Sequence, residues 1–178
     1  MGERRTYGKQ DCSLAGALEI IGERWTLLVL RDCFYGVRRF NDFQAHLDVP
    51  RAVLTDRLKR LVAAGVLERS PTPTGNEYRL TARGTTIWPA IFAIAQWGER
   101  NLAPRSGPRQ VFSHVTCGTD LEPSGLCPHC DDVPGPAQLT TRPGPGAHTG
   151  LRDDPVSRAL TSRPHRLLTG LLSAGEDR

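Results

Sequence analysis

Two pairs of metal-binding residue types lie close together in the second half of the chain. The first pair is His114 and Cys117, and the second pair, nine residues further on, is Cys127 and Cys130. Imidazole nitrogen and thiolate sulfur are the usual ligands of structural zinc, and each pair has the two-residue spacing of a zinc knuckle. The four residues therefore predict a closed Cys3His zinc site, in which no coordination position is left for catalysis.

Other interpretations of this group stay open. His129, inside the second pair, could replace His114 as a ligand. The cysteines could also be free thiols in a loose tail, or two of them could form a disulfide. Because the surrounding sequence has little apolar material, zinc binding would have to drive much of its folding.

A nucleic-acid-binding module is predicted in the first half. Residues 40–47 form one expected helix, residues 48–50 a turn, residues 51–65 a second helix and residues 68–81 a hairpin. This order is that of a winged helix-turn-helix, whose second helix enters the major groove of DNA. The expected fold class is therefore mainly α with a small β-hairpin wing, followed by a small C-terminal Cys/His-rich extension.

The second of these helices has an apolar side and a polar side. Its apolar side, which we expect to face the core, carries Leu54, Leu58, Leu61 and Val62. The other side presents the candidate DNA-reading residues Arg51, Ala52, Thr55 and Lys59. An Arg-Thr-Lys row at this spacing can meet guanine edges, thymine methyl groups and phosphates. Arg38, Arg69 and Arg79 are candidates for phosphate contacts, and the alternative for each is ordinary surface charge.

Three further apolar helices are expected at residues 12–22, 24–35 and 85–102. The last carries a stripe of Ile87, Ile91 and Ile94 at helical spacing. We expect a homodimer built from the helices at 12–22 and 85–102, since a small domain has few other elements to cover this stripe. The alternative is that the stripe packs inside its own subunit.

Composition limits the class of protein. The 178 residues carry a formal net charge of +4, and the excess of positive charge lies in residues 1–100, with 15 Lys+Arg against 11 Asp+Glu. That distribution permits nucleic-acid binding without proving it. No run of 18 apolar residues and no apolar leader in residues 1–10 is present, so we expect no membrane span and a cytoplasmic location. Cysteines there are kept as thiols or metal ligands.

The chain divides into three expected parts: a winged-helix and dimerisation domain at 1–104, a Cys/His-rich segment at 105–135, and a flexible linker with a weakly helical tail at 136–178. Ten of the 14 prolines and nine of the 18 glycines fall in the last 78 residues. Such a composition is typical of flexible segments.

Several of these segments together resemble the HxlR-type (DUF24) regulators, which are related to the MarR repressors. The matching stretches are residues 12–31, 36–43, 54–67, 78–84 and 97–100. The resemblance covers residues 7–102 and implies a homodimer with one winged helix per subunit, bound to a palindromic DNA operator. The tail beyond Leu102 exceeds the compact form of the family.

The resemblance also gives Cys12 a role, because several members of the family sense oxidants or electrophiles through an N-terminal cysteine. A thiol at a helix start feels the partial positive charge of the unpaired N–H groups, which favours thiolate. Arg4, Arg5 and Lys9 are near in sequence, whereas Asp11 opposes the effect. The alternative is a small residue packed at a helix start. Cys33, on an apolar helix, is expected in the core.

The function predicted from these features is transcriptional control, as a homodimeric repressor that responds to an oxidant or electrophile through Cys12. The alternatives are a regulator that responds to a small-molecule effector, and a protein-interaction module built on the zinc tail. An enzyme is not expected, because the sequence has no glycine-rich phosphate loop, no G-x-S-x-G and no H-E-x-x-H.

Overall fold

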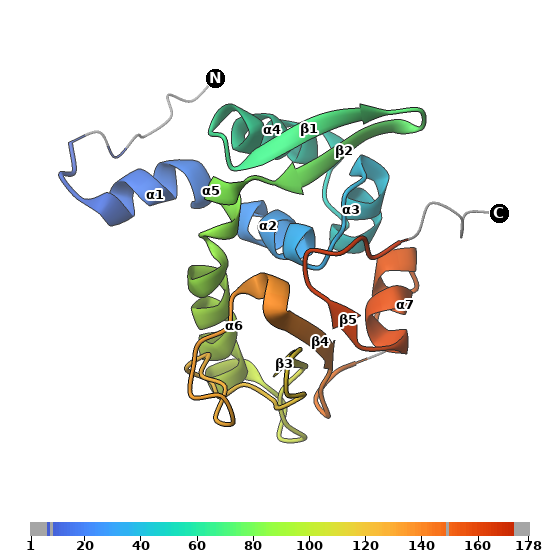
Figure 1. Cartoon of the computed structure of the whole chain (residues 1–178). Coiled ribbons are helices and arrows are strands. Elements are labelled where there is room, and N and C mark those ends of the chain that lie inside the picture. The colour runs from blue at the N-terminus through green and yellow to red at the C-terminus, as the bar shows by residue number, and fades with distance from the viewer. Residues whose placement is uncertain (1–6, 8, 149, 173–178) are drawn as a thin grey trace.

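The computed structural model describes residues 7, 9–148 and 150–172 of the chain. The first eight elements are α1 (Ser13–Ile21), α2 (Thr26–Phe34), α3 (Phe40–Leu47), α4 (Arg51–Ala63), β1 (Leu67–Thr72), β2 (Gly75–Leu80), α5 (Ala82–Thr85) and α6 (Trp88–Leu102). They are followed by β3 (Gln110–His114), a 3-10 turn η1 (Pro136–Gln138), β4 (Leu139–Pro143), α7 (Pro155–Ser162) and β5 (His165–Arg166) (Figure 1). The mainly α winged-helix architecture confirms the predicted fold class.

The helix-turn-helix consists of α3, a tight turn and α4. Asp48 ends α3 with a φ of 53°, a left-handed conformation that aspartate adopts more readily than bulkier residues. Leu54, Leu58 and Leu61 of α4 are fully buried, as their spacing predicted. The opposite side of α4 is therefore free to face a ligand.

A buried carboxylate joins α2 to α3. Asp32 has no exposed surface, and its two oxygens accept hydrogen bonds from the Arg31 guanidinium at 2.7 Å and from His46 Nδ1 at 2.8 Å. A buried charge is tolerated when it is paired and hydrogen-bonded in this way. The network fixes the end of α3 relative to the core.

The wing is an antiparallel hairpin whose register pairs Leu67 with Leu80 and Arg69 with Tyr78. Because side chains alternate along a strand, Arg69 and Tyr78 share one face, and Arg79 lies on the other. The main-chain N–H of Tyr78 donates to the carbonyl of Arg38 at 2.8 Å, which attaches the wing to the segment before α3.

The isoleucine stripe of the last long helix is divided, contrary to the expectation that all of it forms an interface. Ile91 is buried and Ile87 packs against the core, whereas Ile94 is 53 % exposed. The inner face of α6 contributes Trp88 and Phe92 to an aromatic cluster with Phe34 and Phe112. The outer face of α6 leaves Trp97 60 % exposed.

The described part of residues 136–178 is an ordered part of the fold and not the expected flexible linker, whereas α7 agrees with the expected helical tail. Strands β3, β4 and β5 form a three-stranded antiparallel sheet, and α7 packs against α3 (Figure 1). Leu139, Val156 and Leu167 are fully or almost fully buried in the common core. The high proline and glycine content suggested flexibility, but each short apolar stretch packs against residues far away in the sequence. Local sequence patterns do not reveal such packing.

Residues 168–171 run along the corner between α2 and α3. Leu168 N–H donates to the carbonyl of Phe34 at 2.8 Å, and Leu171 N–H donates to that of Gly36 at 3.2 Å. Gly36 has a φ of 85°, and a side chain there would collide with the carbonyl of Thr169. Glycine is thus required for this close approach.

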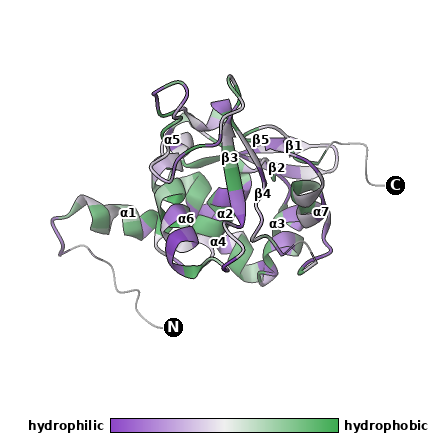
Figure 2. Cartoon of the chain, turned by 90° about the horizontal axis from the view of Figure 1, so that it is seen from below, coloured by the Kyte–Doolittle hydropathy of each residue, from purple (hydrophilic) through white to green (hydrophobic). Residues whose placement is uncertain are grey.

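Helix α1 projects from the body of the molecule, as both cartoons show (Figures 1 and 2). All nine of its residues are described, and Ala15 alone is buried, whereas Leu14 is 66 % exposed. No helix among the described residues is long and apolar enough to cross a membrane.

Candidate nucleic-acid interface and Cys/His cluster

A groove of about 460 Å³ separates α4 from the wing. Four of the predicted DNA-binding residues line it, namely Arg51, Thr55, Lys59 and Arg69. The α4 side chains come from the face opposite the buried leucines, and Arg69 comes from the wing face that it shares with Tyr78. Since Asp42 is the acidic residue of the lining, the groove has a net positive charge, which favours a polyanion.

Local contacts orient two of these side chains. The Arg51 guanidinium lies over the ring of Phe40, 4.8 Å from its centroid, and the Thr55 hydroxyl donates to the carbonyl of Arg51 at 2.8 Å. A cation held on an aromatic face is less mobile than a free arginine, so less conformational entropy is lost when it binds.

The remaining predicted residues lie outside this lining. Ala52 is exposed beside it on α4. Arg79 forms an ion pair with Glu77 at 2.8 Å on the other face of the wing. Arg38 is partly buried and donates to the carbonyl of Leu168 at 3.4 Å. Burial, and next the nearby charge of Arg79, lowers the pKa of Arg38.

Sequence reasoning missed several polar residues that line the groove. They are Arg39, Asn41, Thr72, Thr74 and Asn76. Arg39 and Asn41 flank the start of α3, and Asn76 lies in β2 next to the wing turn. The signal available in the sequence was that both segments are expected next to α4.

The Cys/His cluster comes together at one end of the C-terminal sheet. The ligand atoms of His114, Cys117, Cys127 and Cys130 all lie within 4.8 Å of one another. Cys117 Sγ is 3.5 Å from Cys127 Sγ and 3.7 Å from His114 Nδ1. Tetrahedral zinc with bond lengths of about 2.0–2.3 Å requires ligand separations of roughly 3.5–3.8 Å. The two separations from Cys117 match such an ion, and the four residues are close enough together to hold one, whereas His129 is not part of the group.

The main chain builds two similar knuckles for this group. Gly118 N–H donates to the carbonyl of His114 at 2.8 Å, and Asp131 N–H donates to that of Cys127 at 2.9 Å. His114 Nε2 is buried without a hydrogen-bond partner within the described part of the chain. Hydrogen bonds from the Thr119 side chain and main chain lower the pKa of Cys117 to about 6, whereas burial and then hydrogen bonds to Cys117 and Cys127 raise the pKa of Cys130 to about 12. In the absence of metal, Cys117 is therefore the thiol of this pair that favours the thiolate form.

Comparison with known proteins agrees with this geometry. The model of the HxlR-like helix-turn-helix family matches residues 20–106. Rv3095 of Mycobacterium tuberculosis, named an HTH-type transcriptional regulator, is 42 % identical over 137 residues, which cover 75 % of this chain and 87 % of that protein. The chain belongs to the HxlR-like helix-turn-helix family.

Two further comparisons support this assignment. YybR of Bacillus subtilis, also named an HTH-type transcriptional regulator, is 31 % identical over 57 % of this chain and 86 % of its own length. The crystal structure of PA1607, a proposed transcription factor, superposes with a TM-score of 0.55 at 32 % identity, over 80 % of this chain and 92 % of that one. The HxlR-like chain is thus a helix-turn-helix transcriptional regulator, and this class of protein binds DNA and is not enzymatic. The match to Rv3095 is longer than residues 20–106, so the similarity extends outside the family model.

Two cysteines of this HxlR-like chain lie outside the cluster. Cys12 is the residue before α1 and is exposed, whereas Cys33 is buried. Burial, and next the charge of Asp32, raises the pKa of Cys33 well above its ordinary value. Arg4 and Arg5, which we expected near Cys12, lie outside the described residues.

Proposed function

We propose that the chain is a repressor that binds a palindromic DNA operator as a homodimer. The observation that carries the proposal is the positively charged groove between α4 and the wing, which gathers Arg51, Thr55, Lys59 and Arg69. A helix with exposed polar residues and a basic wing beside it has the form that enters a major groove and holds the adjacent phosphates.

The residues divide into two roles in this proposal. Arg51, Ala52, Thr55 and Lys59 on α4 read base edges and thymine methyl groups. Arg38, Arg69 and Arg79 hold the phosphate backbone, which adds affinity that is independent of sequence.

The dimer is proposed from the largely exposed helix α1, whose C-terminal end packs against the core, and from the outer face of α6. An isolated nine-residue helix is marginal in water, so α1 requires a surface on which to pack. Leu14, Ile94 and Trp97 offer exposed apolar side chains for contact with a second copy. Two-fold symmetry then presents two recognition helices about 34–36 Å apart, one turn of DNA.

The proposed cofactor is one structural zinc ion per chain, held by His114, Cys117, Cys127 and Cys130. Its support is the mutual distance of the four ligand atoms, together with ligand types that zinc prefers. The ion would fix the loop at 117–130 relative to the end of β3 and leave no open position for chemistry.

The proposed signal is an oxidant or electrophile that modifies Cys12. The thiol is exposed at the start of the helix assigned to the dimer interface, so an adduct there would change how the two subunits pack. A small-molecule effector is the alternative signal.

Footprinting tests the central proposal. Purified full-length protein is added to labelled DNA from upstream of its own gene and from random sequence, and protection is followed while salt is increased. We expect protection of one site with two-fold symmetry that survives competition by random DNA. Equal binding to all sequences would contradict the repressor function and leave only a nonspecific DNA-binding or protein-interaction module.

A further inference from the structure

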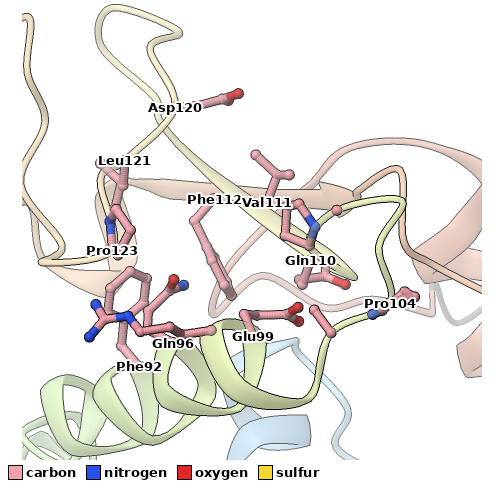
Figure 3. A pocket seen from close by; sticks show the side chains of 14 residues that line it. Phe92, Gln96, Glu99, Pro104, Gln110, Val111, Phe112, Asp120, Leu121 and Pro123 are labelled. Atoms are coloured by element: carbon pink, nitrogen blue, oxygen red, sulfur yellow. The ribbon is translucent and has the colours of Figure 1, made fainter.

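A pocket of about 570 Å³ lies between α6 and β3, and we call it the α6–β3 pocket. Helix α6 belongs to the family module, whereas β3 and the loop at 120–123 come from the C-terminal part. Figure 3 shows Phe92, Gln96 and Glu99 rising from α6, while Phe112 points from β3 toward them. The volume falls in the range of sites for small organic ligands, about 300–1,000 Å³.

The floor of the α6–β3 pocket is aromatic. Phe92 and Phe112 meet edge to face with centroids 5.5 Å apart, and Val111 and Leu121 add aliphatic surface. Trp88 packs against both rings, with its ring centroid 5.9 Å from that of Phe92 and 5.5 Å from that of Phe112. Rings prefer offset or edge-to-face contact with other rings, so this floor favours a flat aromatic group over a flexible chain.

The acidic groups of the pocket already have partners. Glu99 accepts a hydrogen bond from the main-chain N–H of Arg109 at 2.9 Å. Asp120 accepts from Arg142 at 2.8 Å and from the hydroxyl of Ser113 at 2.6 Å. Figure 3 shows the Asp120 side chain pointing away from α6.

Of the side-chain donors that line the pocket, Gln110 donates to the Thr141 hydroxyl, whereas two others have no partner in the described part of the chain. Within residues 7, 9–148 and 150–172, neither Gln96 nor Arg100 makes a side-chain hydrogen bond or an ion pair. Their spacing of four residues places them on the same face of α6. An exposed guanidinium beside an amide, at the edge of an apolar floor, is suited to a carboxylate.

We propose that the α6–β3 pocket binds a small aromatic carboxylate, with the ring on Phe92 and Phe112 and the carboxylate on Arg100 and Gln96. The ligand would contact the family helix and the C-terminal sheet at once. This site is separate from the DNA groove, from the outer face of α6 and from the Cys/His cluster, so its existence does not depend on the proposed function.

Calorimetric titration of the full-length protein with 2-naphthoate, and with the neutral isostere 2-naphthamide, tests the proposal. We expect naphthoate to bind about five- to tenfold more tightly than the amide, because the carboxylate gains a charge-assisted hydrogen bond. Arg100→Gln should remove this preference and Arg100→Lys should keep part of it. Arg105→Gln is the matched control, since Arg105 is also exposed but does not line the pocket.

Gln96→Trp locates the site, because an indole rising from α6 would occupy the space between α6 and β3 that the ligand needs. Its far-ultraviolet circular dichroism and DNA binding report whether the fold is kept. The proposal is overturned if naphthoate shows no binding up to about 5 mM, a concentration that would detect even a weak site. It is also overturned if acid and amide bind equally, if Arg100→Gln and Arg105→Gln behave alike, or if folded Gln96→Trp binds as the wild type does.

Discussion

Arg38 and Leu168 are 130 positions apart in the sequence, and the guanidinium of the first donates to the main-chain carbonyl of the second at 3.4 Å. One of the proposed phosphate-binding residues is therefore held by the C-terminal segment. The same segment donates two main-chain hydrogen bonds to the corner between α2 and α3 and inserts Leu167 and Leu171 into the core. The residues beyond the family model therefore share a hydrophobic core and main-chain hydrogen bonds with the helix-turn-helix module.

The first prediction concerns this continuity. Leu167→Ala should lower the free energy of unfolding by about 2–4 kcal/mol, because it removes a fully buried side chain and leaves a cavity. Denaturant unfolding measures the change. Leu151→Ala, at a residue that is 77 % exposed, is the control and should stay within about 0.5 kcal/mol of the wild type. Equal stability of the two variants would mean that the tail is not part of the cooperative core.

The second prediction separates base reading from phosphate binding. Arg51→Ala should cost about 1–3 kcal/mol on the operator and reduce the preference over random DNA. Arg69→Ala should weaken both DNAs alike and reduce the salt slope by about 1. Fluorescence anisotropy over a range of salt measures both. Arg158→Ala, 58 % exposed on α7, is the control. If Arg51→Ala and Arg69→Ala matched this control, the DNA surface would have to lie elsewhere.

Sequence patterns were sufficient for the helix-turn-helix because its information is local. The period of Leu54, Leu58 and Leu61 identified both the helix and its buried side. Sequence patterns did not predict the burial of Leu139 and Leu167, because that burial depends on strand pairing between residues 140–141 and 165–166. Pairing across such a distance leaves no periodic trace, and the surrounding prolines and glycines suggested flexibility instead.

The same distinction between local and long-range information explains why only part of the groove was predicted. The four residues Arg51, Thr55, Lys59 and Arg69 follow from the exposed sides of a helix and a strand. Asn41 and Asn76 line the groove only because the start of α3 lies close to the wing turn, and the sequence of neither element specifies that approach. Likewise, the spacing of His114 and Cys117 predicted a knuckle, but only the fold brings the second pair within reach.

The third prediction is one zinc ion per chain in protein purified without added metal, with Zn–S distances of about 2.3 Å in X-ray absorption. Cys127→Ser should lose the ion, because it removes one of the four ligands and Cys127 is fully buried within the group. Cys12→Ser should keep it, because that thiol is outside the group. Metal-free wild-type protein in which the three cluster thiols titrate readily would refute the site.

The fourth prediction is that Trp97→Glu converts the dimer to a monomer. The change puts a charge on an exposed apolar face that we assign to the interface, and an unpaired charge there opposes association. Sedimentation at micromolar concentration is the measurement, and Leu151→Glu, at an exposed leucine elsewhere, is the control. A monomeric wild type, or an undisturbed Trp97→Glu dimer, would rule out this interface.

The fifth prediction concerns thiol reactivity. At about pH 8 an alkylating reagent should modify Cys12 and spare Cys33, because burial excludes the reagent and keeps the Cys33 thiol protonated. Mass spectrometry of the native protein reads this out. Diamide should then abolish operator binding by the wild type and leave Cys12→Ser active. Identical responses would move the sensor to the Cys/His cluster, and no response in either would favour a small-molecule effector.

The docking of residues 165–171 against α2 has a consequence for biosynthesis. Phe34 and Gly36 emerge early from the ribosome, but their main-chain partners, Leu168 and Leu171, are translated more than 130 residues later. A core closed by such distant contacts forms slowly, and the nascent chain exposes apolar surface in the meantime. We therefore expect the regulator to become competent for DNA binding only after residues 165–171 have been synthesised, and to rely on chaperones until then.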